Sequence, residues 1–365
     1  MAYTTINKPQ LHFDVLNYTG NGATSSAGTT ARTLTGLGFQ PSFVWVKEEN
    51  DTEQHFWQDN VRGITKVLAS NTTAQQYDCL TDFGSGGINT FTSDGYTIGS
   101  GTGGNTTNIN TNGNGYRSYC WKGAGAGSSN SNGSVTSTVS VDSTSKCSIV
   151  KWTGTGATAT VGHGLGVKPQ MIIIKHTNAT ENWVVYHEKL TADYNLKLNN
   201  TEAQQDTAGA FNDTEPTTSV FTVNTNTNTN ASGQVMVAYC FANVKGYSRF
   251  GKYKGNGEAM GTFIYTGFKP AFVTVKSYST SVHNWCTMDI KNDGFNPTNK
   301  QIHPNTNGAE SLGSGTTIDI LSNGFKMRVN DGDKNGSGTT YVYWAVAAEP
   351  LVANVGASGV PATAR

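Results

Sequence analysis

The sequence predicts an all-β protein made of three tandem β-sandwich units, jelly-roll-like, of about 100 residues each. Composition predicts the class, and an internal repeat predicts the number of units. Thr, Asn, Ser and Gly make up 158 of the 365 residues, and these types favour turns and strands over helices. The chain also carries 15 Phe, 15 Tyr and 7 Trp, which is enough apolar surface for packed cores and argues against disorder.

The internal repeat consists of five landmarks that occur three times in the same order. Each copy opens with an aromatic residue and two glycines and continues with a proline and a strand that ends in lysine. A tryptophan, an Asn-Thr pair and a closing aromatic strand follow. The opening motif lies at 18–22, 152–156 and 253–257, and the proline with its strand at 40–47, 168–175 and 269–276. The tryptophans are Trp57, Trp183 and Trp285. The Asn-Thr pairs lie at 71–72, 200–201 and 305–306, and the closing strands at 119–121, 239–241 and 343–345.

Strand and turn signals fill each copy. Residues 43–46 and 272–275 are β-branched and aromatic runs bounded by proline and a charge, as in buried strands. Asp-Gly or Asn-Gly lies between apolar residues in 91–96 and 321–325, which predicts hairpins. For helix, the best window is 61–70, long enough for one short turn. The Asn-Thr alternation at 224–230 is typical of a hairpin tip.

These signals divide the chain into four parts. The first β-sandwich unit spans residues 1–123, and the second, with a Gly/Ser joint before it, spans 124–249. The third unit spans 250–350, and a tail of small residues spans 351–365. Residues 134–141 alternate between apolar and polar side chains, which predicts the opening strand of the second unit.

Charge and targeting signals exclude several classes. The chain has 25 basic and 25 acidic side chains, so it lacks the basic excess of a nucleic-acid binder. No apolar run is long enough for a membrane span. The N-terminal residues do not resemble a signal peptide, so we expect synthesis in a cytoplasm.

The five cysteines predict neither a disulfide framework nor a zinc site, because their number is odd and no Cys-x-x-Cys spacing occurs. Cys120 and Cys240 share one position of the repeat. The alignment of landmarks places Trp344 there in the third unit. A position that accepts Cys or Trp is apolar, so we expect buried structural thiols.

Two glycine motifs match phosphate-binding patterns in part. Gly-x-Gly-x-x-Gly at 99–104 fits the dinucleotide pattern, but no helix is expected after it. Residues 246–252 have the spacing of a phosphate-binding loop, with Tyr253 where Ser or Thr would bind magnesium. We therefore interpret both as ordinary loop or strand segments.

One motif leaves a metal site open. Asp331, Asp333 and Asn335 match the first half of a calcium loop, but Val342 stands where the bidentate glutamate belongs. A hairpin loop is the favoured interpretation, and calcium binding stays an alternative.

The sequence predicts no enzyme: we assign no catalytic, cofactor-binding or metal-binding residue. Neither a Gly-x-Ser-x-Gly elbow nor a His-Glu-x-x-His motif occurs. We expect His163 to be a turn residue and His187 a core-edge histidine. A carboxylate pair from distant strands would still suit a carbohydrate-active enzyme, which stays the rival class.

Aromatic residues raise the question of sugar binding. One tryptophan per unit at one position is typical of a core, so Trp57, Trp183 and Trp285 are expected to be buried. Loop aromatics are better candidates for glycan contact; those considered are Tyr116, Tyr247 and Tyr278.

Motifs along nearly the whole chain resemble a family of virion-associated proteins from marine tailed bacteriophages, including cyanophages. Its members are described as phage structural or tail-fibre-like proteins, and the resemblance supplies no catalytic residues. The longer first connection and the Gly/Asn-rich insert at 99–115 distinguish the first unit, which we expect to carry the attachment role. The motifs that carry the resemblance are residues 1–7, 18–22, 40–47, 60–63, 93–100, 162–166, 212–217, 237–242, 265–273, 321–326 and 360–365.

The resemblance and the composition together predict a non-enzymatic virion structural protein, a component of a tail fibre or tail appendage that contacts the host surface. The alternative is a capsid decoration or head-fibre protein, followed by a tailspike-like carbohydrate-active enzyme. Expected partners are other virion proteins, further copies of the chain in a homo-oligomer, with a trimer favoured, and a host surface glycan. Neither nucleic acid nor a cofactor is expected.

Overall fold

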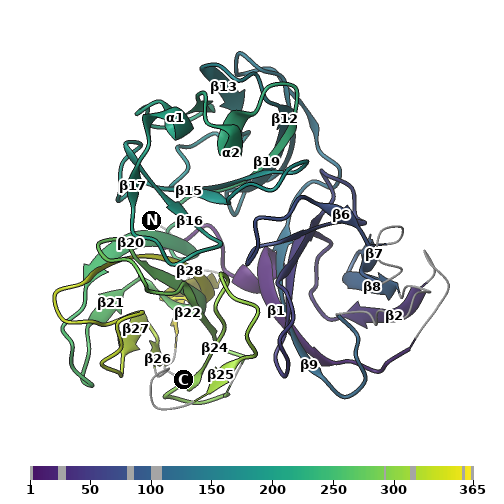
Figure 1. The fold of residues 1–365 in the computed structure, drawn as a ribbon. Helices are drawn as coiled ribbons and strands as arrows, with labels where there is room; N and C mark the ends of the chain where they lie inside the picture. The colour runs from purple at the N-terminus through teal and green to yellow at the C-terminus, as the bar shows by residue number, and fades with distance from the viewer. Residues whose placement is uncertain are drawn as a thin grey trace.

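The computed structural model describes residues 3–23, 30–79, 86–99, 109–291, 293–312, 318–355 and 358–362. It is all-β, with antiparallel sheets gathered into three lobes around a common centre (Figure 1). We call residues 13–122 the first lobe, 128–241 the second and 248–350 the third. Among the described residues there is no helix with the length and apolarity needed to cross a membrane.

The first lobe has a large sheet of order β1-β9-β3-β4-β5-β6 and a small sheet of order β2-β8-β7. Its strands are β1 (Phe13–Thr19), β2 (Thr30–Thr35), β3 (Pro41–Glu48), β4 (Phe56–Asp59), β5 (Lys66–Ala69), β6 (Tyr77–Asp78), β7 (Ile88–Thr92), β8 (Gly95–Gly99) and β9 (Gly115–Lys122), preceded by the 3₁₀ turn η1 (Pro9–Leu11).

The second lobe has a large sheet of order β10-β11-β12-β19-β14-β15-β16-β17 and a small pair β13-β18. Its elements are β10 (Ser128–Asn130), β11 (Ser137–Asp142), β12 (Cys147–Thr153), β13 (Ala159–Gly162), β14 (Met171–His176), β15 (Val184–His187), β16 (Tyr194–Lys197), β17 (Gln205–Asp206), α1 (Ala208–Phe211), β18 (Val220–Val223), α2 (Thr227–Asn230) and β19 (Val235–Phe241).

The third lobe has a sheet of order β20-β28-β22-β23, a small sheet β21-β27-β26 and a pair β24-β25, and a separate hairpin β29-β30 follows it. The strands are β20 (Ser248–Lys254), β21 (Phe263–Tyr265), β22 (Phe268–Ser277), β23 (Cys286–Asp289), β24 (Lys300–Gln301), β25 (Ser311–Leu312), β26 (Ile318–Leu321), β27 (Gly324–Met327), β28 (Thr340–Pro350), β29 (Val352–Val355) and β30 (Ser358–Pro361).

Each large sheet is buried on both faces. One face packs on the small sheet of its own lobe and forms a lobe core, which contains Cys120 in the first lobe and Cys240 in the second. The other face points to the centre, where side chains of all three lobes form one central core. In β3 every residue is buried, because alternate side chains enter the two cores.

Aromatic side chains dominate the central core. Trp344 of the third lobe stacks on Trp121 of the first with ring centroids 5.5 Å apart, and it lies 4.4 Å from Phe241 of the second. Trp57 and Trp183 meet edge to face at 4.9 Å. Such pairs contribute about 0.5–1.5 kcal/mol each beyond their burial, so the core joins the lobes strongly.

Strand register corrects two landmarks of the sequence alignment. Cys120 lies opposite Val44 and Cys240 opposite Ile172, whereas Ala345, not Trp344, lies at the corresponding position opposite Val273. The residues directly before β4, β15 and β23 are His55, Trp183 and Trp285, so the counterpart of the two tryptophans in the first lobe is His55 and not Trp57. The matching bonds prove this: the backbone N–H groups of His55, Trp183 and Trp285 donate to the side-chain oxygens of Asn71, Asn199 and Asn305.

The two-glycine motif closes each lobe with a buried asparagine. In the second lobe Asn230 accepts the N–H of Thr155 (2.9 Å) and donates to Ala157 O (2.7 Å) and Asn224 O (2.9 Å). A Cβ at Gly154 would overlap a carbonyl oxygen of the opposing segment, and Gly156 has φ +70°, which glycine adopts without strain. Asn110 and Asn335 make the same kind of bonds to the motif in the first and third lobes.

Backbone hydrogen bonds close the three lobes into a ring. Corresponding loops donate from each lobe to the next, the third to the first included. The three bonds are Gln76 N–H to Thr177 O (2.8 Å), Gln204 N–H to Tyr278 O (3.0 Å) and Glu310 N–H to Glu49 O (2.8 Å).

Each of β3, β14 and β22 carries a lysine as its next-to-last residue, and two of these lysines reinforce the junctions between lobes. Lys175 donates to Thr73 O of the first lobe (2.9 Å), and Lys276 donates to Thr201 O of the second (3.0 Å). Lys47 bonds carbonyls of its own lobe. Burial lowers the pKa of all three lysines to about 8.

At two of the three junctions around the central core, a tyrosine of one lobe donates a hydrogen bond to an aspartate of another. Tyr239 donates to Asp59 (2.8 Å), and Tyr119 donates to Asp289 (3.0 Å). At the third junction Trp344 replaces the tyrosine, and His187 replaces the aspartate. His187 Nδ1 accepts the N–H of Lys189, so Nε2 carries the proton and donates to a backbone carbonyl of β28 (3.2 Å).

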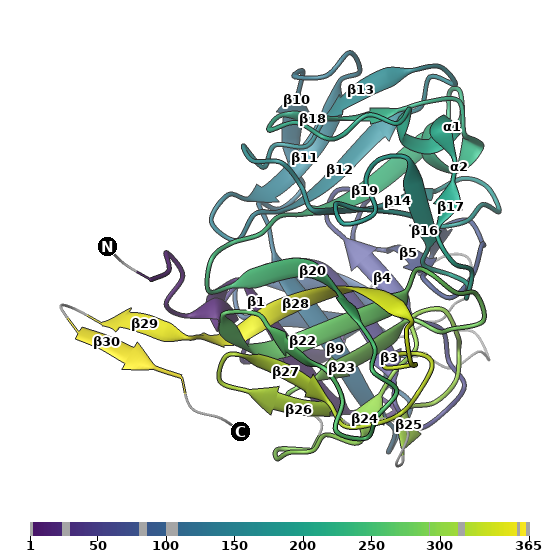
Figure 2. The same ribbon diagram turned by 90° about the vertical axis from the view of Figure 1, so that its left-hand side faces the viewer.

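Several expectations about local structure were wrong. The window 61–70 holds a turn and strand β5, not helix, and the Asn-Thr run ends in helix α2. Part of the Gly/Ser joint is strand β10, which pairs with β11. The tail contains the hairpin β29-β30, which projects from the body beside the N-terminal segment (Figure 2). The two predicted hairpins, β7-β8 and β26-β27, are confirmed.

Candidate functional site

A cavity among the described residues lies where the second lobe passes into the third. Its volume is about 430 Å³, within the usual range for small-molecule sites. Its walls come from the joint between β19 and β20, the turn between β21 and β22, and the N-terminal segment. The lining residues are Tyr3, Asn243, Val244, Lys245, Gly246, Ser248, Arg249, Tyr265, Thr266 and Gly267.

A tight turn presents the joint to the cavity. Tyr247 is buried, and its N–H donates to Val244 O (2.9 Å). Gly246 has φ +78°, and a Cβ there would meet Thr4. The hydroxyl of Thr4 donates to Lys245 O (2.8 Å). Anchored on both sides, the turn leaves the side chain of Lys245 exposed to solvent.

Two tyrosines form the aromatic wall. Tyr3 donates to Gly267 O (2.5 Å), and its backbone N–H donates to Asn354 Oδ1 (3.1 Å). Burial, with the neighbouring Tyr265 hydroxyl, raises the pKa of Tyr3 to about 12, so Tyr3 is neutral and a donor at pH 7. Tyr265 is 48% exposed and offers a free ring face.

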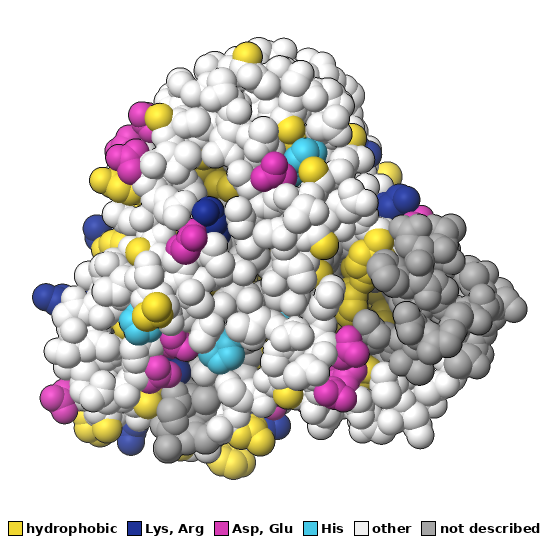
Figure 3. All heavy atoms as spheres, viewed as in Figure 1, with side chains coloured by type: hydrophobic (Ala, Val, Ile, Leu, Met, Phe, Trp, Pro, Cys, Tyr) yellow, Lys and Arg dark blue, Asp and Glu magenta, His cyan; other side chains and the backbone are white. Residues whose placement is uncertain are grey.

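The cavity is cationic. Lys245 and Arg249 both line it and are exposed, and no Asp or Glu occurs among its described lining residues. Neither cation forms an ion pair with a described acidic residue. The ammonium of Lys245 lies 4.8 Å above the ring of Tyr3. The guanidinium of Arg249 also lies within hydrogen-bonding reach of the Tyr343 hydroxyl group. The wider surface is mostly neutral and polar on the face of Figure 3, so a pocket that has two cations and no acid in its described lining stands out.

A second cavity of about 320 Å³ lies between the first and second lobes. Its lining contains two cations, Arg62 and Lys151. Arg62 is already bound to Asp59 Oδ2 (2.6 Å) and to Trp57 O (2.8 Å). The indole of Trp152 on its wall is buried. This cavity therefore offers a ligand one cation, Lys151, and lacks the exposed aromatic ring of the first.

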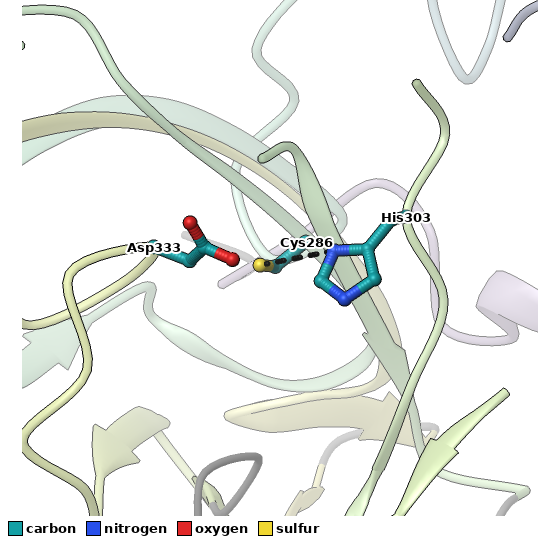
Figure 4. A group of neighbouring side chains, drawn as sticks. All are labelled: Cys286, His303 and Asp333. Atoms are coloured by element: carbon teal, nitrogen blue, oxygen red, sulfur yellow. Dashed lines mark hydrogen bonds between the residues drawn. The ribbon is translucent and has the colours of Figure 1, made fainter. Parts of the chain in front are cut away.

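Three side chains of metal-ligating types meet in the third lobe: Cys286, His303 and Asp333 (Figure 4). Their donor atoms lie within 4.8 Å of one another, and Cys286 Sγ is 3.7 Å from His303 Nδ1. This geometry would suit a zinc ion if the donors were free.

The donors of this cluster are occupied by the fold. His303 Nδ1 donates to Trp285 O (3.0 Å). Asp333 accepts the N–H (2.8 Å) and the side-chain amide (3.1 Å) of Asn284. Burial raises the pKa of the Cys286 thiol and lowers that of His303.

The second lobe shows what Asp333 does. There Asn228, an amide, accepts the N–H of Asn182 (2.7 Å) at the corresponding place. Because the amide of Asn228 accepts a backbone N–H just as Asp333 does, the carboxylate of Asp333 is explained by its structural role as a hydrogen-bond acceptor. We interpret the cluster as packing rather than a metal centre.

The calcium-loop residues are engaged in the same way. Asp331 pairs with Lys334 and accepts the N–H of Asp333. Asn335 is the buried asparagine that closes the third lobe. These bonds favour the hairpin-loop interpretation of the motif.

The other predicted positions are mostly structural. Trp57, Trp183 and Trp285 are buried, as are Tyr116 and Tyr247, so the last two were wrong as glycan contacts; Tyr278 is half-buried. His163 is buried in the connection after β13 and His187 is buried in the core, and burial lowers the pKa of each to about 4. All five cysteines are free and buried. Tyr253 belongs to strand β20, and most of the 99–104 motif lies outside the described residues.

The sequence reasoning missed the cavity residues Tyr3, Lys245, Arg249 and Tyr265. One signal was readable: in β21 aromatic residues occupy both positions flanking Ile264, and the strand alternates exposed, buried, exposed. Aromatic side chains on the solvent side of a strand have no core to fill.

The fold and the cavity define a three-lobed β protein with a cationic, aromatic-walled pocket. The chain belongs to the family described as Domain of unknown function (DUF7483), whose model matches residues 8–350. The match takes in all three lobes. Searches of the curated proteins and of the solved structures give no match.

Proposed function

We propose that this chain is a non-enzymatic structural protein of a bacteriophage virion, a component of a tail fibre or tail appendage that contacts the host surface. The observation that supports this best is a rigid body that exposes polar, cationic and aromatic groups in one cavity. The lobes are fixed by one central core and a closed ring of hydrogen bonds. The cavity at Lys245 and Arg249 opens to solvent on that body.

We also propose that the lobes are three tandem β-sandwich repeats of one unit. The recurring sheet orders, the three buried asparagines and the three interlobe backbone bonds support a triplication. A triplicated ring would suit a single copy on a threefold axis, which favours the second candidate function, a capsid decoration or head-fibre protein.

An enzyme is the weaker proposal. A glycosidase needs two carboxyl groups about 5–9.5 Å apart across the scissile bond. The described lining of the larger cavity offers cations, amides and hydroxyls instead. These groups can hold a ligand by hydrogen bonds and charge.

Immunogold electron microscopy of purified phage particles tests the location. An antibody raised against this chain should label the tail, and pre-immune serum should label nothing. Label spread over the head would contradict the tail proposal and favour the decoration protein. Particles without label would contradict both.

A further inference from the structure

The cavity beside Tyr3 has the donor set that an acidic sugar requires. Lys245 supplies a point charge, and Arg249 supplies a planar fork that can bind both oxygens of a carboxylate. The side-chain oxygen of Asn243 already accepts the N–H of Phe250 (2.9 Å), so its amide NH₂ is the part left for a ligand. Carboxylate and hydroxyl groups on one sugar ring would use all three side chains.

The aromatic wall fits the other face of such a ring. Tyr265 is 48% exposed, and Phe263, which lies outside the cavity lining on the same side of β21, is 45% exposed and extends the aromatic surface. The C–H face of a sugar packs on aromatic rings of this kind, while its hydroxyl groups stay in water. Pocket walls that combine aromatic rings with a few polar groups are typical of small-ligand sites.

Only the third lobe has exposed aromatic side chains at these strand positions among the corresponding described residues. Phe263 and Tyr265 flank Ile264, which lies opposite Phe325. In the first lobe Thr33 and Thr35 flank the residue opposite Tyr96, and in the second Thr160 and Gly162 flank the residue opposite Phe221. The fold thus does not require aromatic side chains here, which points to a role in binding.

We propose that this cavity binds a carboxylated sugar, a uronic acid unit of a surface polysaccharide. The inference rests on the proposed contact with a host surface and names its ligand class. Sulfated polysaccharides share the negative charge, and the experiment separates the two.

Isothermal titration calorimetry of the full chain with tetragalacturonate tests the proposal, with maltotetraose as the neutral oligomer. We expect binding of tetragalacturonate that weakens with added salt and at least about tenfold weaker binding of maltotetraose. Equal binding of both oligomers, or binding of neither, would overturn the proposal. Tighter binding of an oligosaccharide of dextran sulfate than of tetragalacturonate would replace the carboxylate by a sulfate ester and overturn it as well.

Variants locate the site. Arg249→Gln should weaken tetragalacturonate binding about tenfold or more, and Tyr265→Ala should weaken it too. Lys252→Gln is the matched control, because Lys252 is an exposed cation on the same strand outside the cavity lining. Equal affinity of Arg249→Gln and Lys252→Gln would overturn the assignment. Unchanged thermal unfolding of each variant establishes that it is folded.

The two proposals fail separately. Particles labelled by the antibody combined with no uronate binding would retain the virion role and reject the ligand. Uronate binding to purified protein combined with unlabelled particles would retain the ligand and reject the virion role.

Discussion

Asn230→Asp should severely destabilise the protein while it hardly changes the shape of the side chain. The amide of Asn230 is fully buried and donates to Thr155 Oγ1 (3.0 Å), Ala157 O (2.7 Å) and Asn224 O (2.9 Å). The substitution places an acceptor oxygen against two backbone carbonyl oxygens and a hydroxyl group. The lost hydrogen bonds cost about 1 kcal/mol each, and the unpaired buried groups raise the total to about 4–6 kcal/mol.

Urea unfolding followed by tryptophan fluorescence measures this loss. Asn132→Asp is the control, because Asn132 is exposed and should change stability by less than about 0.5 kcal/mol. Asn110→Asp should cost somewhat less than Asn230→Asp, since the Asn110 amide donates to two acceptors. If Asn230→Asp and Asn132→Asp unfolded at the same urea concentration, the asparagine would not close the lobe and the reasoning would fail.

Four further predictions follow from burial and contact. Burial lowers the pKa of His187 to about 4, so the unfolded chain alone binds that proton between pH 6.5 and 4. The contribution of His187 to the free energy of unfolding is complete above pH 6.5 and falls by about 3 kcal/mol by pH 4. Urea midpoints measure this loss, and an equally steep decline in His187→Gln would contradict the assignment. Trp344→Ala should cost about 3–5 kcal/mol and lower one common calorimetric transition, whereas separate transitions for the lobes would argue against a shared core. Gly154→Ala should lower Tm strongly because its Cβ meets backbone, while Gly209→Ala, with neighbours no closer than 3.6 Å, should leave Tm nearly unchanged; similar Tm values would refute the contact. EDTA should not shift Tm, because Asp333 accepts hydrogen bonds from Asn284 and needs no metal ion. A lower Tm in EDTA would show that this loop binds a metal ion.

The sequence predicted the order of strands better than the alignment of single residues. Matching like letters placed Tyr343 beside Tyr119 and Tyr239, one residue early. A shift of one residue moves a strand side chain to the opposite face, so Tyr343 lies in the core of the third lobe and Trp344 in the centre. The matching of Trp57 to Trp183 was two residues off and kept the correct face, which is why its burial was still predicted.

A substitution in one lobe and its compensation in another are invisible to a scan along the chain. Trp344 has no hydroxyl, and the residue that faces this junction from the second lobe is a histidine instead of an aspartate. Only the folded chain brings these positions together. The repeat in the sequence therefore does not show which residue of a neighbouring lobe compensates for a change in one copy.

The candidate site could not be predicted because it joins distant segments. Tyr3 and Gly267 are separated by 264 positions and are joined by one hydrogen bond. Lys245 and Arg249 look like ordinary cations of a connecting segment. Their lack of nearby acids is a property of the assembled surface and has no local sequence signal.

The shared central core has a consequence for inheritance. A gene fragment for one lobe would encode a sheet whose central face carries large aromatic side chains without a cover, and such faces aggregate. Recombination between related genes would therefore preserve function when it exchanges the whole chain or the outer loops. Exchange of a single lobe would mismatch side chains such as Trp344 and His187. We expect the three lobes to be inherited together, and we expect sequence variation to be greatest in the loops farthest from the centre.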